Sequence, residues 1–147
     1  MEKAEKYRLL ERQLAALLEG ETDAIAKMAN VAAVLHETFG FWWTGFYRVT
    51  GDELVLGPFQ GPVACMHIPF GKGVCGTAWK RNETVVVPDV EQFPGHIACS
   101  SASRSEIVVP VHAADGTVTA VLDIDSDRLA TFDEEDKVWL ERIVKLL

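Results

Sequence analysis

The sequence lacks any run of basic residues, and its 14 Lys and Arg against 22 Asp and Glu give a net charge of −8. Nucleic-acid binding relies on clustered Lys and Arg that release counterions from phosphates, so this composition argues against nucleic-acid partners. No stretch approaches the roughly 18 consecutive apolar residues of a membrane span. No apolar signal-type segment follows the charged residues 1–6. We therefore expect a cytoplasmic protein with no membrane partner.

Cysteine is scarce as well, with Cys65, Cys75 and Cys99 as the three in 147 residues. Thiols of the cytoplasm are kept reduced and the number is odd, so these residues are not expected to form a structural disulfide framework. They are then inert core residues, metal ligands or reactive thiols. The length suits one domain, and neither a repeat nor a linker divides it, which predicts a single domain over residues 1–147.

Hydrophobic spacing predicts helices at both ends of the chain and strands between them. The expected helices are residues 2–19, 23–39, 74–81 and a last one that opens at 131–134 and runs to the C-terminus. The expected strands are residues 43–49, 53–59, 65–69, 84–87, 105–113 and 117–125. Thr22 is expected to cap the second helix, and Thr131 with Glu134 has the spacing of a capping box for the last one.

This order of elements predicts an α+β fold with a central antiparallel sheet of about six strands. The dipeptide Asp115-Gly116 is a strong hairpin signal between the last two strands. We expect the helices to gather mainly on one face of the sheet, which leaves the other face for a pocket covered by loops. Residues 88–104, which hold Cys99 among Pro, Gly, Ser and Ala, are the expected active loop.

The surroundings of each cysteine favour different interpretations. Small and polar residues follow Cys99, and from this alone a reactive and a structural cysteine are equally supported. His96, three residues earlier, is close enough to help hold a thiolate if the turn is helical. Cys65, on the expected third strand, more readily fits a buried small hydrophobe. Cys75 lies near a helix N-terminus, which lowers a thiol pKa but is equally a good packing position.

A zinc site is an alternative for two of these cysteines. Cys65, His67, His96 and Cys99 would supply two thiolates and two imidazoles, the ligand set of a structural zinc site. Against it, Cys-x-His on a strand is an unusual spacing for zinc, and the sequence has no Cys-x-x-Cys knuckle. The spacing therefore favours a site without metal.

Three acidic residues are expected to converge at one end of the last hairpin. Asp123 and Asp125 alternate along a strand and so project from the same face. The Asp-Gly turn places Glu106 opposite roughly residue 125. A solvated sheet edge would explain such a group. The alternative is a site that binds an ammonium group, or that holds a proton because mutual repulsion raises one pKa.

Taken together, these segments resemble the signature blocks of the free methionine-(R)-sulfoxide reductases, a family of GAF domains. The resemblance covers roughly residues 20–147, and its most specific feature is the Gly-His-Ile-Ala-Cys loop together with the three-cysteine set. The matching blocks are residues 43–47, 61–65, 70–78, 87–90, 93–99, 105–110 and 122–125. The resemblance implies a GAF-type fold and reduction of the R epimer of free methionine sulfoxide, with protein-bound methionine sulfoxide excluded.

The resemblance also implies a role for each candidate residue. Cys99 matches the attacking cysteine, Cys65 the resolving cysteine and Cys75 an accessory thiol that can join the relay. Thioredoxin is the implied reductant, and this chemistry needs no metal or organic cofactor. The implied substrate-binding residues are Trp43, which would pack against the substrate methyl group, and the acids Glu106, Asp123 and Asp125.

Two other function classes remain as alternatives. A GAF-type regulatory module would bind a cyclic nucleotide or another small ligand without reacting, and it would need neither Cys99 nor Cys65. A zinc-stabilised interaction domain would bind stoichiometric metal. The two N-terminal helices could pair two chains into a homodimer, although their apolar stripe fits packing on the chain's own sheet equally well.

Overall fold

A six-stranded antiparallel sheet divides the protein into two faces in the computed structural model, which describes residues 1–97, 99 and 102–147. The strand order is β3-β2-β1-β6-β5-β4. The strands are β1 (Trp43–Thr50), β2 (Glu53–Gln60), β3 (His67–Pro69), β4 (Val85–Val87), β5 (Ser105–His112) and β6 (Val118–Ser126). The helices are α1 (Lys3–Leu18), α2 (Ala24–Phe39), α3 (Gly73–Arg81) and α4 (Glu134–Ile143), with short 3₁₀ helices η1 (Val90–Gln92) and η2 (Val144–Leu146).

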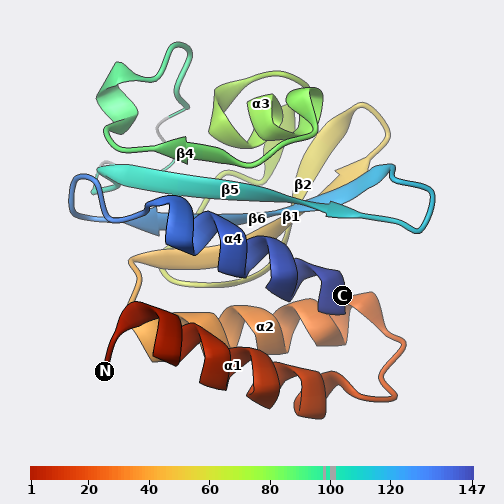
Figure 1. Cartoon of the computed structure of the whole chain (residues 1–147). Helices are drawn as coiled ribbons and strands as arrows, with labels where there is room; N and C mark the ends of the chain where they lie inside the picture. Colours follow the sequence, from red (N-terminus) through yellow and green to blue (C-terminus); the bar gives the residue numbers. More distant parts are fainter. Residues whose placement is uncertain (98, 100–101) are drawn as a thin grey trace.

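Three helices cover one face of the sheet, and α3 lies on the other (Figure 1). Helix α2 packs against β1 and β2, and α4 packs against β5. Helix α1 lies one layer further out, against α2 and α4. The predicted α+β fold, with about six strands and helices mainly on one face, is therefore confirmed.

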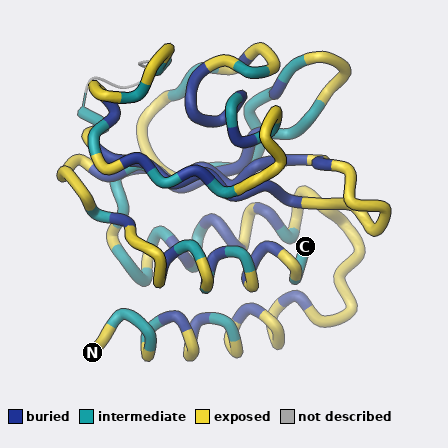
Figure 2. The backbone as a smooth tube through the Cα atoms, turned by 45° about the horizontal axis from the view of Figure 1, so that its top comes forward, coloured by how far each residue is buried: buried dark blue, intermediate teal, exposed yellow. Residues whose placement is uncertain are grey.

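The alternation of side chains along the central strands creates two separate cores. On β6, Leu122 and Ile124 are fully buried in the core beneath the helices. Their neighbour Val121 faces the other side, where it packs in the core that includes α3. Figure 2 shows the resulting pattern, with buried backbone in the sheet and exposed residues on the outer helix faces and turns.

Helix α1 is attached to the body of the protein through Tyr7. The ring is fully buried, its centroid lies 4.5 Å from that of Phe39, and it stacks on Trp139 at 6.1 Å. Its hydroxyl donates a hydrogen bond of 2.6 Å to Asp136 Oδ1, while Lys3 Nζ donates to Oδ2 of the same carboxylate at 2.8 Å. The apolar stripe of α1 is thus covered by the chain's own helices.

The cap of α2 differs from the expected one. The helix begins at Ala24, and Asp23 caps it, with its carboxylate accepting a hydrogen bond of 2.9 Å from the Ala26 N–H. Thr22 lies one residue too early to reach that donor. Both residue types are favoured at this position, so the pattern alone did not separate them.

The capping box of α4 is also shifted, from Thr131 and Glu134 to Asp133 and Asp136. The Asp133 carboxylate accepts from the Asp136 N–H, and the Asp136 carboxylate accepts from the Asp133 N–H. The Thr131 hydroxyl is occupied elsewhere, in a 2.6 Å hydrogen bond with the Ser126 hydroxyl at the end of β6. The Thr131 side chain thus bonds within the turn that precedes α4, and the cap lies two residues later.

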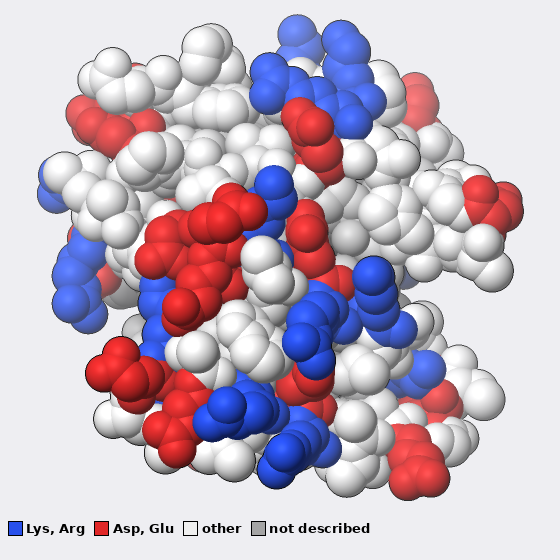
Figure 3. Space-filling view, in the orientation of Figure 1, with Lys and Arg blue, Asp and Glu red and all other residues white. Residues whose placement is uncertain are grey.

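The surface agrees with the composition. Acidic and basic side chains both occur on the face shown in Figure 3, with a compact basic group at the top of the view and an acidic group nearer the middle. Among the described residues, no helix is long and apolar enough to cross a membrane.

Candidate active site

A pocket lies on the α3 face of the sheet and collects nearly all the predicted site residues. Of the seven, six line it directly: Trp43, Cys75, Cys99, Glu106, Asp123 and Asp125. The seventh, Cys65, is joined to the pocket through its bond to Cys99. The expected arrangement, with helices on one face and a pocket on the other, is therefore present.

Cys65 and Cys99 form a disulfide, with Cα atoms 5.4 Å apart. The bond joins the loop between β2 and β3 to the long segment between η1 and β5. It also bears on the alternative zinc site, because the two sulfurs that would bind zinc are bonded to each other. In addition, His67 is exposed and pairs with Glu53 at 2.8 Å. The four-ligand zinc site is therefore wrong for this state of the protein.

Cys65 lies in a loop, not on a strand as expected, because β3 begins only at His67. The Tyr47 hydroxyl donates a hydrogen bond of 2.9 Å to the Cys65 carbonyl oxygen. Trp43 Nε1 donates one of 3.0 Å to the Pro62 carbonyl oxygen in the same loop. Two side chains of β1 thus hold this loop by hydrogen bonds to its carbonyl oxygens.

The three acids converge as predicted. Glu106 on β5 is the cross-strand partner of Asp125 on β6, and Asp123 projects from the same face two residues earlier. Glu106 and Asp123 are both buried, with 5% of their surface exposed. The alternative of a solvated sheet edge is wrong, because β5 and β6 both lie inside the sheet.

Burial dominates the electrostatics of this group. Loss of solvation raises the pKa of Glu106 well above its usual range, and the nearby Asp123 and Asp125 raise it further. The pKa of Asp125 is raised well above its usual range by burial and then by Asp123, and burial raises that of Asp123 as well. Protons are therefore retained on this cluster at a pH where exposed carboxyls are ionised.

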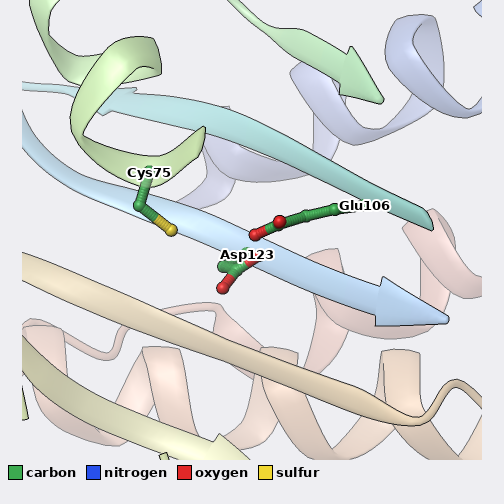
Figure 4. A group of neighbouring side chains, drawn as sticks. All are labelled: Cys75, Glu106 and Asp123. Atoms are coloured by element: carbon green, nitrogen blue, oxygen red, sulfur yellow. The ribbon is translucent and has the colours of Figure 1, made fainter. Parts of the chain in front are cut away.

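Cys75 is the free cysteine, and it is buried beside these acids. Its Sγ and one carboxylate oxygen each of Glu106 and Asp123 lie within 4.8 Å of one another (Figure 4). The expectation that the N-terminus of α3 lowers its pKa is wrong. Burial raises the pKa of the thiol well above its usual value, and the neighbouring carboxylates add to this effect.

Trp43 forms an aromatic wall of the pocket. Its ring stacks on Phe59 at 5.2 Å and on Tyr47 at 5.9 Å, and only 4% of the residue is exposed. Gly45 makes this possible, because a Cβ at that position would lie 2.7 Å from the indole ring. Trp43 therefore packs in the core of this face and forms a wall of the pocket at the same time.

Two further pocket residues, His96 and Tyr47, differ from what the sequence analysis predicted. His96 faces Glu106, with Nε2 3.8 Å from its Oε1, and burial lowers the pKa of the imidazole. No helix spans residues 93–97 in the described structure, so the expected helical turn toward Cys99 is not formed there. Tyr47 was not identified as a site residue, although the alternation of 43, 45 and 47 along β1 would have placed it beside Trp43.

Comparison with known proteins agrees with this geometry. The family model described as GAF domain matches residues 20–147. The free methionine-R-sulfoxide reductase of Escherichia coli is 47% identical over 148 residues, covering 100% of this chain and 89% of that protein. The crystal structure of free methionine-R-sulfoxide reductase from Neisseria meningitidis in complex with its substrate has a TM-score of 0.97 and 55% identity. That match covers 99% of this chain and 88% of the other.

The chain belongs to the GAF-domain family of free methionine-(R)-sulfoxide reductases. The expected resemblance is therefore confirmed at the level of the family. GAF domain-containing protein A of Dictyostelium discoideum, at 57% identity over 99% of this chain and 92% of that protein, is a further relative.

The first prediction for this GAF domain concerns the hold of Tyr47 on the Cys65 loop. Tyr47→Phe removes one hydrogen bond that favours the loop geometry of the disulfide. We expect the equilibrium constant for its formation in glutathione buffers to fall about five- to tenfold, or about 1 kcal/mol. The measurement is the oxidised fraction of the protein after alkylation, followed by mass spectrometry.

Tyr7→Phe is the matched control, since it removes a buried tyrosine hydroxyl on the opposite face of the sheet. It should lower the free energy of unfolding and leave the disulfide equilibrium unchanged. Equal shifts in both variants would show that general destabilisation, and not the hold on Cys65, is responsible.

A second prediction concerns stability against pH. The pKa of Glu106 is higher in the folded than in the unfolded protein, so its contribution to stability is full at low pH and is lost as pH rises through the folded pKa. Glu106→Gln cannot ionise. We expect it to raise the free energy of unfolding at pH 8 by about 1 kcal/mol, and by less at pH 5.

Urea unfolding at the two pH values measures this difference. The exposed Glu91→Gln serves as the control and should show no such pH dependence. A gain for Glu106→Gln that is the same at pH 5 and pH 8 would contradict the role of Glu106 as a buried, protonated acid.

Proposed function

We propose that this protein reduces free L-methionine-(R)-sulfoxide to methionine through a cysteine sulfenic acid and disulfide cycle. The observation that carries the proposal is the Cys65–Cys99 disulfide at a pocket lined by three acids, two of which, Glu106 and Asp123, are buried. The names of its relatives in Escherichia coli and Neisseria meningitidis support the same activity. The structure corresponds to the oxidised state of this cycle.

In the first step the Cys99 thiolate attacks the sulfoxide sulfur. That sulfur is electrophilic only when its oxygen is protonated or strongly hydrogen-bonded, and a buried acid with a raised pKa is suited to supply the proton. Glu106 and Asp125 both have this property. The sulfur of the substrate is reduced, the oxygen passes to Cys99 as a sulfenic acid, and methionine leaves.

In the second step the Cys65 thiol attacks the sulfenic sulfur of Cys99. The S–S bond forms as the S–O bond breaks, and the oxygen leaves as water. The position of Cys65, held by Tyr47 through its carbonyl oxygen, favours this cysteine over Cys75 as the resolving residue. Cys75 remains an accessory thiol in this scheme, since burial and its acidic neighbours disfavour its thiolate.

Selectivity for the free amino acid follows from charge. Asp123 Oδ1 is buried and has no hydrogen-bond partner among the described residues, so it can accept from the α-ammonium group of the substrate. A peptide-bound methionine sulfoxide has no such charge. Its binding would leave the buried Asp123 carboxylate unpaired and would therefore be weaker. The Trp43 indole would pack against the substrate methyl group at the opposite wall.

The reductant that restores the thiols is proposed to be thioredoxin. An external dithiol must reach the disulfide, and the residues flanking Cys65 are open to a protein partner. Val63 is 88% exposed and Met66 is 68% exposed, although both are apolar. Such residues beside a disulfide suit the docking of a protein dithiol better than that of a small thiol.

Two further expectations stay predictions. The buried stripe of α1 is already covered, so a homodimer through the N-terminal helices would have to use their exposed apolar residues. These include Leu9 and Leu17 on α1 and Ile25 on α2, each about half exposed. The cytoplasmic location rests on the sequence alone.

The central prediction is that Cys99 is required for turnover. Wild-type protein with free methionine-(R)-sulfoxide and thioredoxin, or a small dithiol, should produce methionine. Cys99→Ser should lower turnover by a factor of about 1,000 or more, as expected for loss of a nucleophile. Methionine is measured by chromatography, with the S epimer and a peptide-bound sulfoxide as substrate controls.

The proposal is wrong if the wild type shows no turnover with either reductant, or if Cys99→Ser keeps full activity. In the first case a ligand-binding GAF module without redox chemistry becomes the better interpretation.

A fourth prediction separates attack from resolution. Cys65→Ser leaves the first step intact, so it should release about one methionine per chain in a single turnover and then react poorly with thioredoxin. Cys75→Ser, the matched control, should turn over at close to the wild-type rate. Unimpaired thioredoxin-driven turnover in Cys65→Ser would assign resolution to Cys75.

A further inference from the structure

The pocket brings together three side chains of types that can bind a metal ion. The proposed reaction does not require these three to act as a group. Cys75 Sγ and a carboxylate oxygen each from Glu106 and Asp123 lie within 4.8 Å of one another. They come from three different elements, α3, β5 and β6, and Figure 4 shows all three side chains directed toward a common point. All three residues are buried.

A second observation indicates that this group is built to contact a ligand. Only 5% of the surface of Asp123 is exposed, and its Oδ1 has no hydrogen-bond partner among the described residues. A buried acceptor without a hydrogen-bond partner lowers stability unless a ligand satisfies it. No Lys or Arg lines the pocket within the described part of the chain, so no fixed cation faces these acids there.

The donor set distinguishes one class of cation from another. Mg²⁺ and Ca²⁺ prefer oxygen ligands alone, whereas a thiol together with carboxylates is a set that Zn²⁺ accepts. His96 Nε2 lies 3.8 Å from Glu106 Oε1 but outside the group of atoms that lie within 4.8 Å of one another, so its side chain would have to move inward to supply a fourth, imidazole ligand. In tetrahedral zinc sites a sulfur and an oxygen ligand are roughly 3.6 Å apart, so the donors would have to close by only about 1 Å.

We propose that Cys75, Glu106 and Asp123, with His96 as the fourth ligand, form a binding site for Zn²⁺ that inhibits the enzyme. Binding itself does not depend on catalysis; the inhibition rests on the proposed function, because zinc would occupy the carboxylates that receive the substrate ammonium group. A zinc-bound thiol is deprotonated by the metal, which compensates for the effect of burial on Cys75. The site differs from the zinc site considered above, which required Cys65 and Cys99.

The test uses the oxidised protein, in which the disulfide removes Cys65 and Cys99 as zinc ligands. Titration of thiols under denaturing conditions should first confirm one free thiol per chain. Isothermal titration with zinc chloride is then expected to show one zinc ion per chain. Cys75→Ser should weaken binding by more than the roughly 10- to 100-fold that loss of an outer-shell partner costs.

His67→Gln is the matched control, since His67 and Glu53 form an exposed pair that could bind zinc at the surface. It should leave the affinity unchanged. Asp123→Asn should weaken binding as Cys75→Ser does, which keeps the test decisive if one variant fails to fold. With Co²⁺ in place of zinc, a thiolate-to-metal absorption band should appear in the wild type and be absent from Cys75→Ser.

Absence of zinc binding in the oxidised protein, or equal binding by Cys75→Ser and wild type, would overturn the proposal. A kinetic experiment separates this failure from failure of the proposed function. Turnover that zinc does not inhibit would reject the inhibitory role of zinc and leave the proposed reductase activity standing. Zinc binding without any turnover would reject the reductase activity and leave the zinc site standing.

Discussion

The gathering of three carboxyl groups on adjacent strands, two of them buried and none with a Lys or Arg beside it in the described pocket, is the constraint on which the rest of this structure depends. Solvent cannot screen them, so repulsion and lost solvation both oppose folding. The fold tolerates them in part because protons remain on the cluster. The same protons suit the site to reactions in which a substrate oxygen must be protonated. An unfavourable electrostatic arrangement is thus retained at the point where chemistry can use it.

The opposite face of the sheet offsets this cost. Next to the cross-strand pair of Glu106 and Asp125, the pair Ile107 and Ile124 points toward the helices, where both residues are fully buried. Because alternate residues of one strand serve the two faces, the acids are fixed by strands whose other side chains form the main core. Helix α1 closes that core through Tyr7. The main core and the candidate active site therefore occupy opposite sides of the same two strands.

Periodicity and turn signals were sufficient to predict the sheet, the helices and the convergence of the acids. The Asp115-Gly116 turn and the alternation of Asp123 and Asp125 both depend on residues close in sequence, so local reasoning could place Glu106 against Asp125. The pairing of Cys65 with Cys99 was different, since the residues themselves left it open and only the family resemblance implied it. Local reasoning failed where a distant side chain intervened, as Tyr47 does at the Cys65 carbonyl.

The Cys75 thiol shows the same limit in electrostatic form. Its place near the start of α3 is visible in the sequence, and the helix dipole alone would favour the thiolate by at most about 1–2 kcal/mol. Complete burial and the approach of Glu106 and Asp123 act in the opposite direction and prevail. Those neighbours come from the hairpin at the other end of the chain, so the sign of the pKa shift is a property of the tertiary fold. A thiol that is unreactive by itself but adjacent to two carboxylates is better suited to bind a cation than to act as a nucleophile, and this distinguishes Cys75 from the two cysteines of the disulfide.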